Sequence, residues 1–168
     1  MALDAPWIEA FRYHRWANLH LLDVCAKLPD EQLQLTSPGT YGTIAATLHH
    51  LVAAEQRYAE RFTGGKATTN EEDEFPGVAR LRELASESAD QLIEAAGKGK
   101  PKVVEVDWPD GKYNLDLTVV IVQALHHGND HRTHICPILG QHDIPYGDMD
   151  VWAYGDATGG IVQLSSKG

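Results

Sequence analysis

Histidines carry the clearest chemical signal in this sequence. The chain has nine of them in 168 residues, and four lie between His126 and His134. His127 and His131 are four residues apart, so on a helix their rings project from one face at neighbouring levels. A helix offers two imidazoles to a single metal ion with this spacing. The segment is therefore predicted to supply two ligands of a metal centre.

The helix that would carry this pair can be projected at 100° per residue. Its apolar stripe is made of Val120, Ile121, Ala124, Ile135, Ile138 and Leu139. His131 falls inside the stripe, and His127 lies at its margin beside His134. His126 points away from it and is predicted to be a solvated residue. A lone buried histidine is usually only a hydrogen-bonded core residue, whereas a pair at this spacing favours a metal.

A third ligand is expected from another helix, and the candidates are the adjacent His49 and His50. Both lie on the flanks of an apolar stripe, so periodicity does not choose between them. Glu55 projects to the middle of that stripe, where a carboxylate must be paired, protonated or near a cation. Two interpretations stay open for Glu55. It either orients a ligand imidazole or accepts a buried hydrogen bond from a Tyr, Trp or Arg side chain.

Apolar periodicity and helix-end signals predict four long helices, over about residues 4–27, 43–62, 76–96 and 118–139. Pro137 is expected to distort the last helix or end it early. Two short alternating runs, 102–106 and 113–117, flank Pro109-Asp110-Gly111 and predict a β-hairpin in which Asp-Gly supplies the turn. The segment after Gly140 is predicted to be a packed irregular arm.

These elements predict an all-α fold. The expected architecture is a four-helix bundle with a long acidic crossover between the second and third helices and a small β-hairpin before the last helix. No boundary for a second domain is evident, so residues 1–168 are predicted to form a single domain.

Composition excludes several classes of function. Lys plus Arg number 14 against 24 Asp plus Glu, which gives a net charge of −10. Such a charge disfavours nucleic acids and anionic membranes as partners. No apolar run approaches the roughly 20 residues that span a bilayer, and residues 1–7 do not resemble a signal peptide. Cys25 and Cys136 are expected to be buried free thiols. A soluble, cytoplasmic protein is expected.

Three segments together resemble the DinB-like (YfiT-like) family of four-helix bundle proteins. They are Tyr-His-Arg-Trp-Ala-Asn at 13–18, Thr-Leu-His-His-Leu-Val-Ala-Ala-Glu at 47–55 and His-Gly-Asn-Asp-His-Arg-Thr-His-Ile at 127–135. In the family, the ligand histidine of the second helix precedes a Leu-Val pair, which selects His50. The last segment is similar to the family's His-x3-His-Arg-x-Gln-Ile. The resemblance therefore implies a metal site of His50, His127 and His131.

The chain departs from this family pattern at His134, which stands where glutamine is common. His134 can be a fourth ligand, an acid/base group or a passive substitution, and we expect it to line the pocket. The resemblance implies that water fills the remaining metal positions and that the protein is a homodimer. Zinc, nickel and iron all suit imidazole ligands. Family members with assigned activities are mostly transferases or isomerases that use a low-molecular-weight thiol.

The leading hypothesis is a metal-dependent enzyme that acts on a small-molecule substrate. An open metal position would activate a low-molecular-weight thiol for transfer or isomerisation, with His134 and Glu55 as candidate proton carriers. One alternative is a hydrolase that activates water. Another is a non-catalytic, metal-binding stress-response protein, in which His134 would close the coordination sphere.

Overall fold

The computed structural model describes residues 6–98 and 103–165, which form six α-helices and one β-hairpin. The four long helices are α1 (Pro6–Cys25), α3 (Ile44–Thr63), α4 (Val78–Gly97) and α5 (Leu117–Gln141). The short elements are α2 (Asp30–Leu33), β1 (Val103–Trp108), β2 (Gly111–Asp116) and α6 (Val151–Thr158). The mostly helical fold agrees with the prediction, and α2 and α6 are additions to it.

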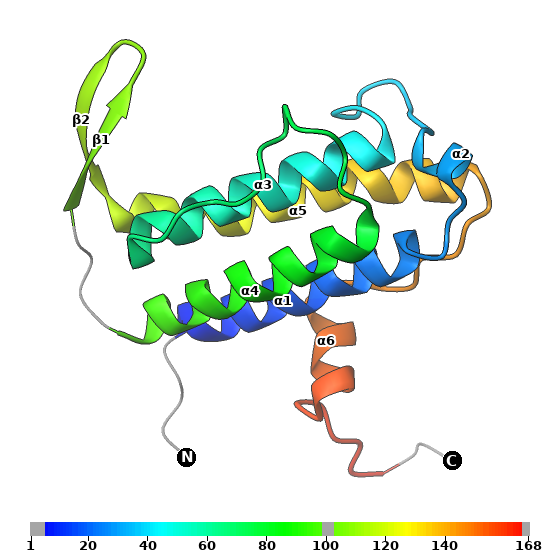
Figure 1. Ribbon diagram of the computed structural model, residues 1–168. Helices are drawn as coiled ribbons and strands as arrows, with labels where there is room; N and C mark the ends of the chain where they lie inside the picture. The colour runs from blue at the N-terminus through cyan, green and yellow to red at the C-terminus, as the bar shows by residue number, and fades with distance from the viewer. Residues whose placement is uncertain (1–5, 99–102, 166–168) are drawn as a thin grey trace.

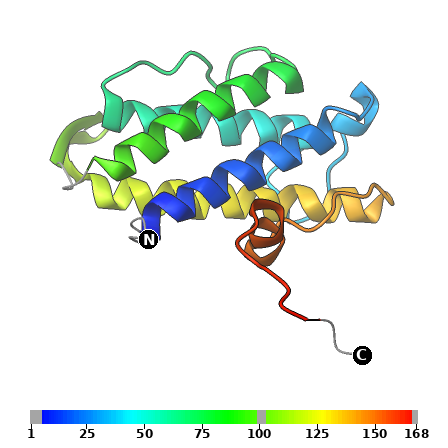
Figure 2. The same cartoon turned by 90° about the horizontal axis from the view of Figure 1, so that it is seen from below.

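The four long helices pack around a shared interior (Figures 1 and 2). Helix α1 lies against α4 and α5, and α3 lies against the same two helices on the other side. Apolar residues from all four helices form two buried clusters, one at each end of the interior. The larger cluster includes Leu22, Leu48, Leu81 and Ile138, and the smaller one includes Phe11, Ala59, Leu92 and Ala124.

Capping residues explain where several helices begin and end. The Thr43 hydroxyl accepts a hydrogen bond from the Ala46 N–H at 3.1 Å, which caps the start of α3. Gly64, with a φ of 70°, ends the same helix in a left-handed conformation. The Asp116 carboxylate caps α5 by accepting from the Thr118 N–H. The observed ends of the four long helices differ from the predicted ends by only a few residues. The predicted start of the first helix, at about residue 4, lies outside the described residues.

Of the two effects predicted for Pro137, distortion or an early end of the last helix, the early end is wrong. Helix α5 continues through Pro137 to Gln141. Proline removes one N–H from the helix but lies on its exposed side, while Ile135, Ile138 and Leu139 are completely buried around it. Their burial holds the last turns in place against the local preference of proline.

The hairpin is confirmed, and its turn lies one residue earlier than predicted. Strands β1 and β2 pair in antiparallel register from Val103–Asp116 to Trp108–Gly111, so Pro109 and Asp110 form the two-residue loop. Gly111 has a φ of 150° and begins the second strand.

The segment after α5 contains a helix where an irregular arm was predicted. The Asp150 carboxylate caps α6 by accepting from the Ala153 N–H at 2.8 Å. The Tyr154 hydroxyl donates to Glu9, and the Tyr13 hydroxyl donates to the Met149 carbonyl. These contacts attach α6 and the preceding residues to α1. Across the described residues, no helix has the combination of length and apolar character needed to cross a membrane.

Pro137 provides a test of how tertiary packing overrides local preference. We expect Pro137→Ala to raise the free energy of unfolding by roughly 1–3 kcal/mol, because alanine restores the missing N–H and removes the ring's clash with the preceding turn. Chemical denaturation measures the change. Val122→Ala, at an exposed position of α5, is the control, with an expected gain of about 0.5 kcal/mol. A Pro137→Ala gain no larger than the control would contradict the explanation.

Candidate metal centre

Helices α3 and α5 lie side by side and bring three of the predicted residues together. One ligand nitrogen from each of His50, His127 and His131 lies within 4.8 Å of the others. The Nε2 atoms of His50 and His127 are 3.0 Å apart. Two nitrogens bound at 2.0–2.1 Å to one tetrahedral metal ion lie roughly 3.3 Å apart. The cluster can therefore hold a metal ion.

Burial keeps the imidazoles of His127 and His131 in the form that binds metals. His131 is only 6% exposed, and His50 and His127 are partly buried. Burial, followed by the charges of neighbouring histidines, lowers the pKa of His127 to about 3 and that of His131 to about 4. Both rings are neutral at neutral pH, and a neutral imidazole is the species that coordinates a metal. The donor set thus fits a divalent transition metal.

Two residues that the sequence did not single out surround His50. The Tyr41 ring stacks on the His50 ring with centroids 4.4 Å apart and meets the His131 ring edge-on at 4.9 Å. The Glu71 carboxylate contacts His50 Nδ1. That contact lowers the pKa of Glu71, chiefly through the hydrogen bond with His50. Glu71 belongs to the acidic run 71–74, in which no sequence signal distinguishes it from its neighbours.

The adjacent histidines of α3 have different surroundings. His50 joins the cluster, whereas His49 Nε2 lies 3.0 Å from the Thr69 hydroxyl and its ring meets Phe75 edge-on. The structure therefore assigns His50, and not His49, to the cluster, a choice that periodicity left open. On α5, the exposed His126 pairs with Asp130 at 2.9 Å and is not a member of the cluster.

His134 borders the cluster without joining it. Its Nδ1 lies 3.4 Å from Nδ1 of His131, and the two rings meet edge-on. Among residues 6–98 and 103–165, the group of ligand atoms within 4.8 Å of one another contains only His50, His127 and His131. His134 is thus placed where it can exchange a proton with one candidate ligand or contact a bound molecule.

Glu55 belongs to a separate, buried polar network. Its carboxylate accepts hydrogen bonds from Asn18 Nδ2 and Ser88 Oγ, both at 2.8 Å, and lies 2.7 Å from His14 Nε2. The Arg132 guanidinium donates a hydrogen bond to the side-chain oxygen Oδ1 of Asn18 at 2.6 Å. The imidazole that Glu55 orients is therefore that of His14, which the sequence interpretation had not assigned a role.

Gly128 lets this network pack against α5, next to a candidate ligand. A Cβ atom at this position would lie 2.1 Å from Cε1 of His14. His14 is buried and lies in contact with Glu55, so moving its ring aside would break this buried contact. Any side chain at this position, next to His127 in the sequence, would have to displace the His14 ring.

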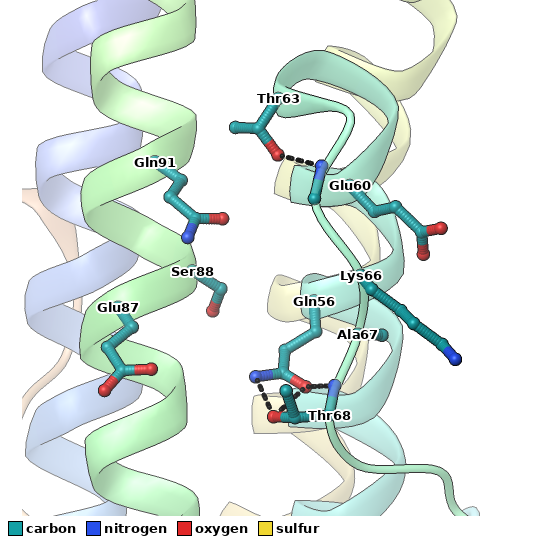
Figure 3. Close-up of a pocket in the computed structure, with 10 residues that line it drawn as sticks. Gln56, Glu60, Thr63, Lys66, Ala67, Thr68, Glu87, Ser88 and Gln91 are labelled. Carbon is teal, nitrogen blue, oxygen red and sulfur yellow. Dashed lines mark hydrogen bonds between the residues drawn. The ribbon is translucent and has the colours of Figure 1, made fainter.

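A small cavity lies between α3 and α4, beneath the segment that follows α3 (Figure 3). Its volume is about 110 Å³, and its lining includes Gln56, Glu60, Thr68, Glu87, Ser88 and Gln91. Ser88 is buried and donates to Glu55. The cavity therefore borders the Glu55 network, and none of the three clustered histidines lines it.

Neither cysteine is suited to act as a nucleophile. Both Cys25 and Cys136 are free thiols, as predicted, but only Cys25 is fully buried and Cys136 is partly buried. Burial raises the pKa of Cys25 to about 12 and also raises that of Cys136. The thiolate is the reactive form, so these groups are unreactive at neutral pH.

Comparison with known proteins identifies the family. The DinB family model matches residues 2–142, and the chain belongs to this family. Its structure is similar to the crystal structure of a DinB-like protein from Bacillus cereus ATCC 10987, with a TM-score of 0.64 and 17% sequence identity. The match covers 84% of this chain and 94% of that chain. At this identity the likeness concerns the fold. No curated protein matches the sequence.

The lowered histidine pKa values predict acid sensitivity of the metal-free protein. In the folded state the pKa of His127 is about 3 and that of His131 is about 4, so neither residue binds a proton at pH 5 to 6.5. In the unfolded chain both residues have ordinary pKa values and take up protons below about pH 6.5. The free energy of unfolding should therefore fall by about 1–2 kcal/mol per histidine as the pH drops from 6.5 to 5.

Denaturation of chelator-treated protein at several pH values measures this effect. His131→Gln should lose less stability on acidification than the original chain, while the exposed control His126→Gln should behave like the original. Equal pH dependence in all three proteins would refute the burial argument.

The close approach at Gly128 predicts a strong effect of a small substitution. Gly128→Ala should lower the free energy of unfolding by about 1–3 kcal/mol, because the added methyl group overlaps the fixed His14 ring. Gly97→Ala is the matched control, since a Cβ there meets its nearest atom at 3.7 Å. Thermal unfolding compares the two, and an equal effect would show that His14 relocates freely.

Proposed function

We propose that the chain is a metal-dependent enzyme that activates a low-molecular-weight thiol for transfer or isomerisation of a small-molecule substrate. In this proposal His50, His127 and His131 hold zinc, nickel or iron. The observation that carries it is the number of converging ligands. Within the described residues, three imidazoles and no fourth His, Cys, Asp or Glu share the group. Catalytic metal sites commonly have three protein ligands and an open position, whereas structural sites are closed by four.

A bound divalent cation lowers the pKa of a thiol or water molecule and so provides a nucleophile at neutral pH. The chain itself supports an external thiol as that nucleophile, because burial raises the pKa of both cysteines. His134, beside His131, is the proposed proton carrier. The exposed Tyr41 ring packs over two of the three histidines and is placed to contact a substrate.

The contacts of Glu55 favour a different role from the proton transfer suggested by the sequence. All the hydrogen bonds of its carboxylate go to His14, Asn18 and Ser88. We propose that Glu55 fixes the helices that carry the centre. The same proposal includes the four-helix bundle, single-domain organisation, homodimer and cytoplasmic location expected from the sequence.

Metal analysis of protein purified without an affinity tag tests the centre. We expect about one zinc, nickel or iron ion per chain. His127→Ala should lose most of this metal and remain helical by circular dichroism, because one of three ligands is gone. His126→Ala, which removes the exposed neighbouring histidine, should retain it. A metal-free original chain, or equal metal content in both variants, contradicts the proposed site.

Turnover of electrophilic substrates tests the chemistry. The metal-loaded protein should form products only when a small thiol is added, and His127→Ala should lose at least tenfold in rate. Turnover without any thiol would instead indicate a hydrolase that uses water. Metal binding without turnover across several thiols would indicate a non-catalytic metal-binding protein.

A further inference from the structure

The crossover, residues 64–77, runs back along α3 after that helix ends (Figure 1). Its first half is attached to α3 by the Gln56 side chain, whose oxygen accepts from the N–H groups of Thr68 and Thr69 at 3.0 and 3.2 Å. The contact between Thr69 and His49 adds a second attachment. These bonds bring the following acidic residues close to His50.

Glu71 is the crossover residue that reaches the histidine cluster. One carboxylate oxygen contacts His50 Nδ1 and also accepts from the Tyr41 hydroxyl at 3.3 Å. The other oxygen lies 3.6 Å from a guanidinium nitrogen of Arg57. On the opposite side of the same ring, His50 Nε2 faces His127. The carboxylate and the candidate metal position therefore lie at the two different nitrogens of one imidazole.

We infer that Glu71 is a positioning residue that prepares His50 for metal binding, and that metal binding in turn holds the crossover in place. This inference rests on the proposed metal site. A carboxylate at Nδ1 accepts a hydrogen bond from the Nδ1–H, which keeps the proton on that nitrogen and leaves the lone pair on Nε2 free for a cation. It also fixes the rotation of the ring, so that Nε2 stays directed at His127.

The coupling must act in both directions. If the contact with Glu71 raises metal affinity by some factor, metal raises the stability of that contact by the same factor. The physical cause is that a cation on Nε2 withdraws electrons from the ring and makes the Nδ1–H a stronger donor. Partners of this kind typically change metal affinity 10–100-fold. The crossover should therefore be held more firmly when the three histidines bind a cation.

Metal affinity of Glu71→Gln tests the first half of the inference. Competition between the protein and a chromogenic chelator for Zn²⁺ should show a 10–100-fold loss of affinity. Glu72→Gln removes the same charge from the neighbouring exposed position and should change affinity less than about threefold. With Co²⁺ in place of Zn²⁺, the visible absorption of Glu71→Gln should also differ from that of the original chain. A purely structural role would lower the melting temperature of the metal-free protein and leave the Co²⁺ spectrum unchanged.

Hydrogen exchange measured by mass spectrometry tests the second half. Addition of Zn²⁺ should slow amide exchange in residues 70–76 of the original chain and of Glu72→Gln, but not of Glu71→Gln. The hairpin, residues 103–116, is the internal control and should not respond.

The outcomes distinguish a failure of the proposed metal site from a failure of the inference about Glu71. An original chain that binds no Zn²⁺ overturns the proposed site and the inference together. If the original chain binds Zn²⁺ and Glu71→Gln binds it equally well, the positioning role of Glu71 is rejected while the metal site stands. If affinity falls but crossover exchange responds equally in both proteins, the coupling is rejected.

Discussion

A carboxylate buried between four helices is the constraint on which the arrangement of this protein depends. Glu55 is 2% exposed, and an unpaired charge at such a position is very unfavourable. The Glu55 carboxylate is stable here because it has polar partners: His14 and Asn18 on α1, and Ser88 on α4. Helix α5 joins through Arg132, which donates to Asn18. A helix that slipped by one turn would leave these groups without partners, so the network fixes the relative positions of all four helices.

The candidate metal centre depends on that alignment. His50 lies on α3 and His127 on α5, and their facing nitrogens are 3.0 Å apart. A displacement of one helical turn, about 5.4 Å, would separate them beyond the reach of one ion. The polar network also divides the interior, because it lies between the two apolar clusters along each helix. Hydrophobic burial thus provides most of the stability at the two ends, and hydrogen bonding determines the alignment in the middle.

Sequence alone predicted the elements with strong periodicity and left open what depends on three-dimensional contacts. Helical spacing brought His127 and His131 to one face, and family resemblance selected His50 over His49. Nothing local distinguishes Glu71 within an acidic run, because its position depends on the path of the crossover. Proline's local preference suggested an early end that α5 does not show, since the burial of neighbouring residues outweighs it. Helix α6 was missed because its eight residues have weak apolar periodicity.

Helix α6 lies outside the part of the chain that the family model matches. The family match ends at residue 142, and α6 begins at Val151. It is attached to α1 by the Tyr154–Glu9 and Tyr13–Met149 hydrogen bonds, on the side of the molecule formed by α1. The histidine cluster lies between α3 and α5. The described contacts of α6 are thus made with α1, away from the two helices that carry the candidate ligands, so a change in α6 would leave the three histidines in place.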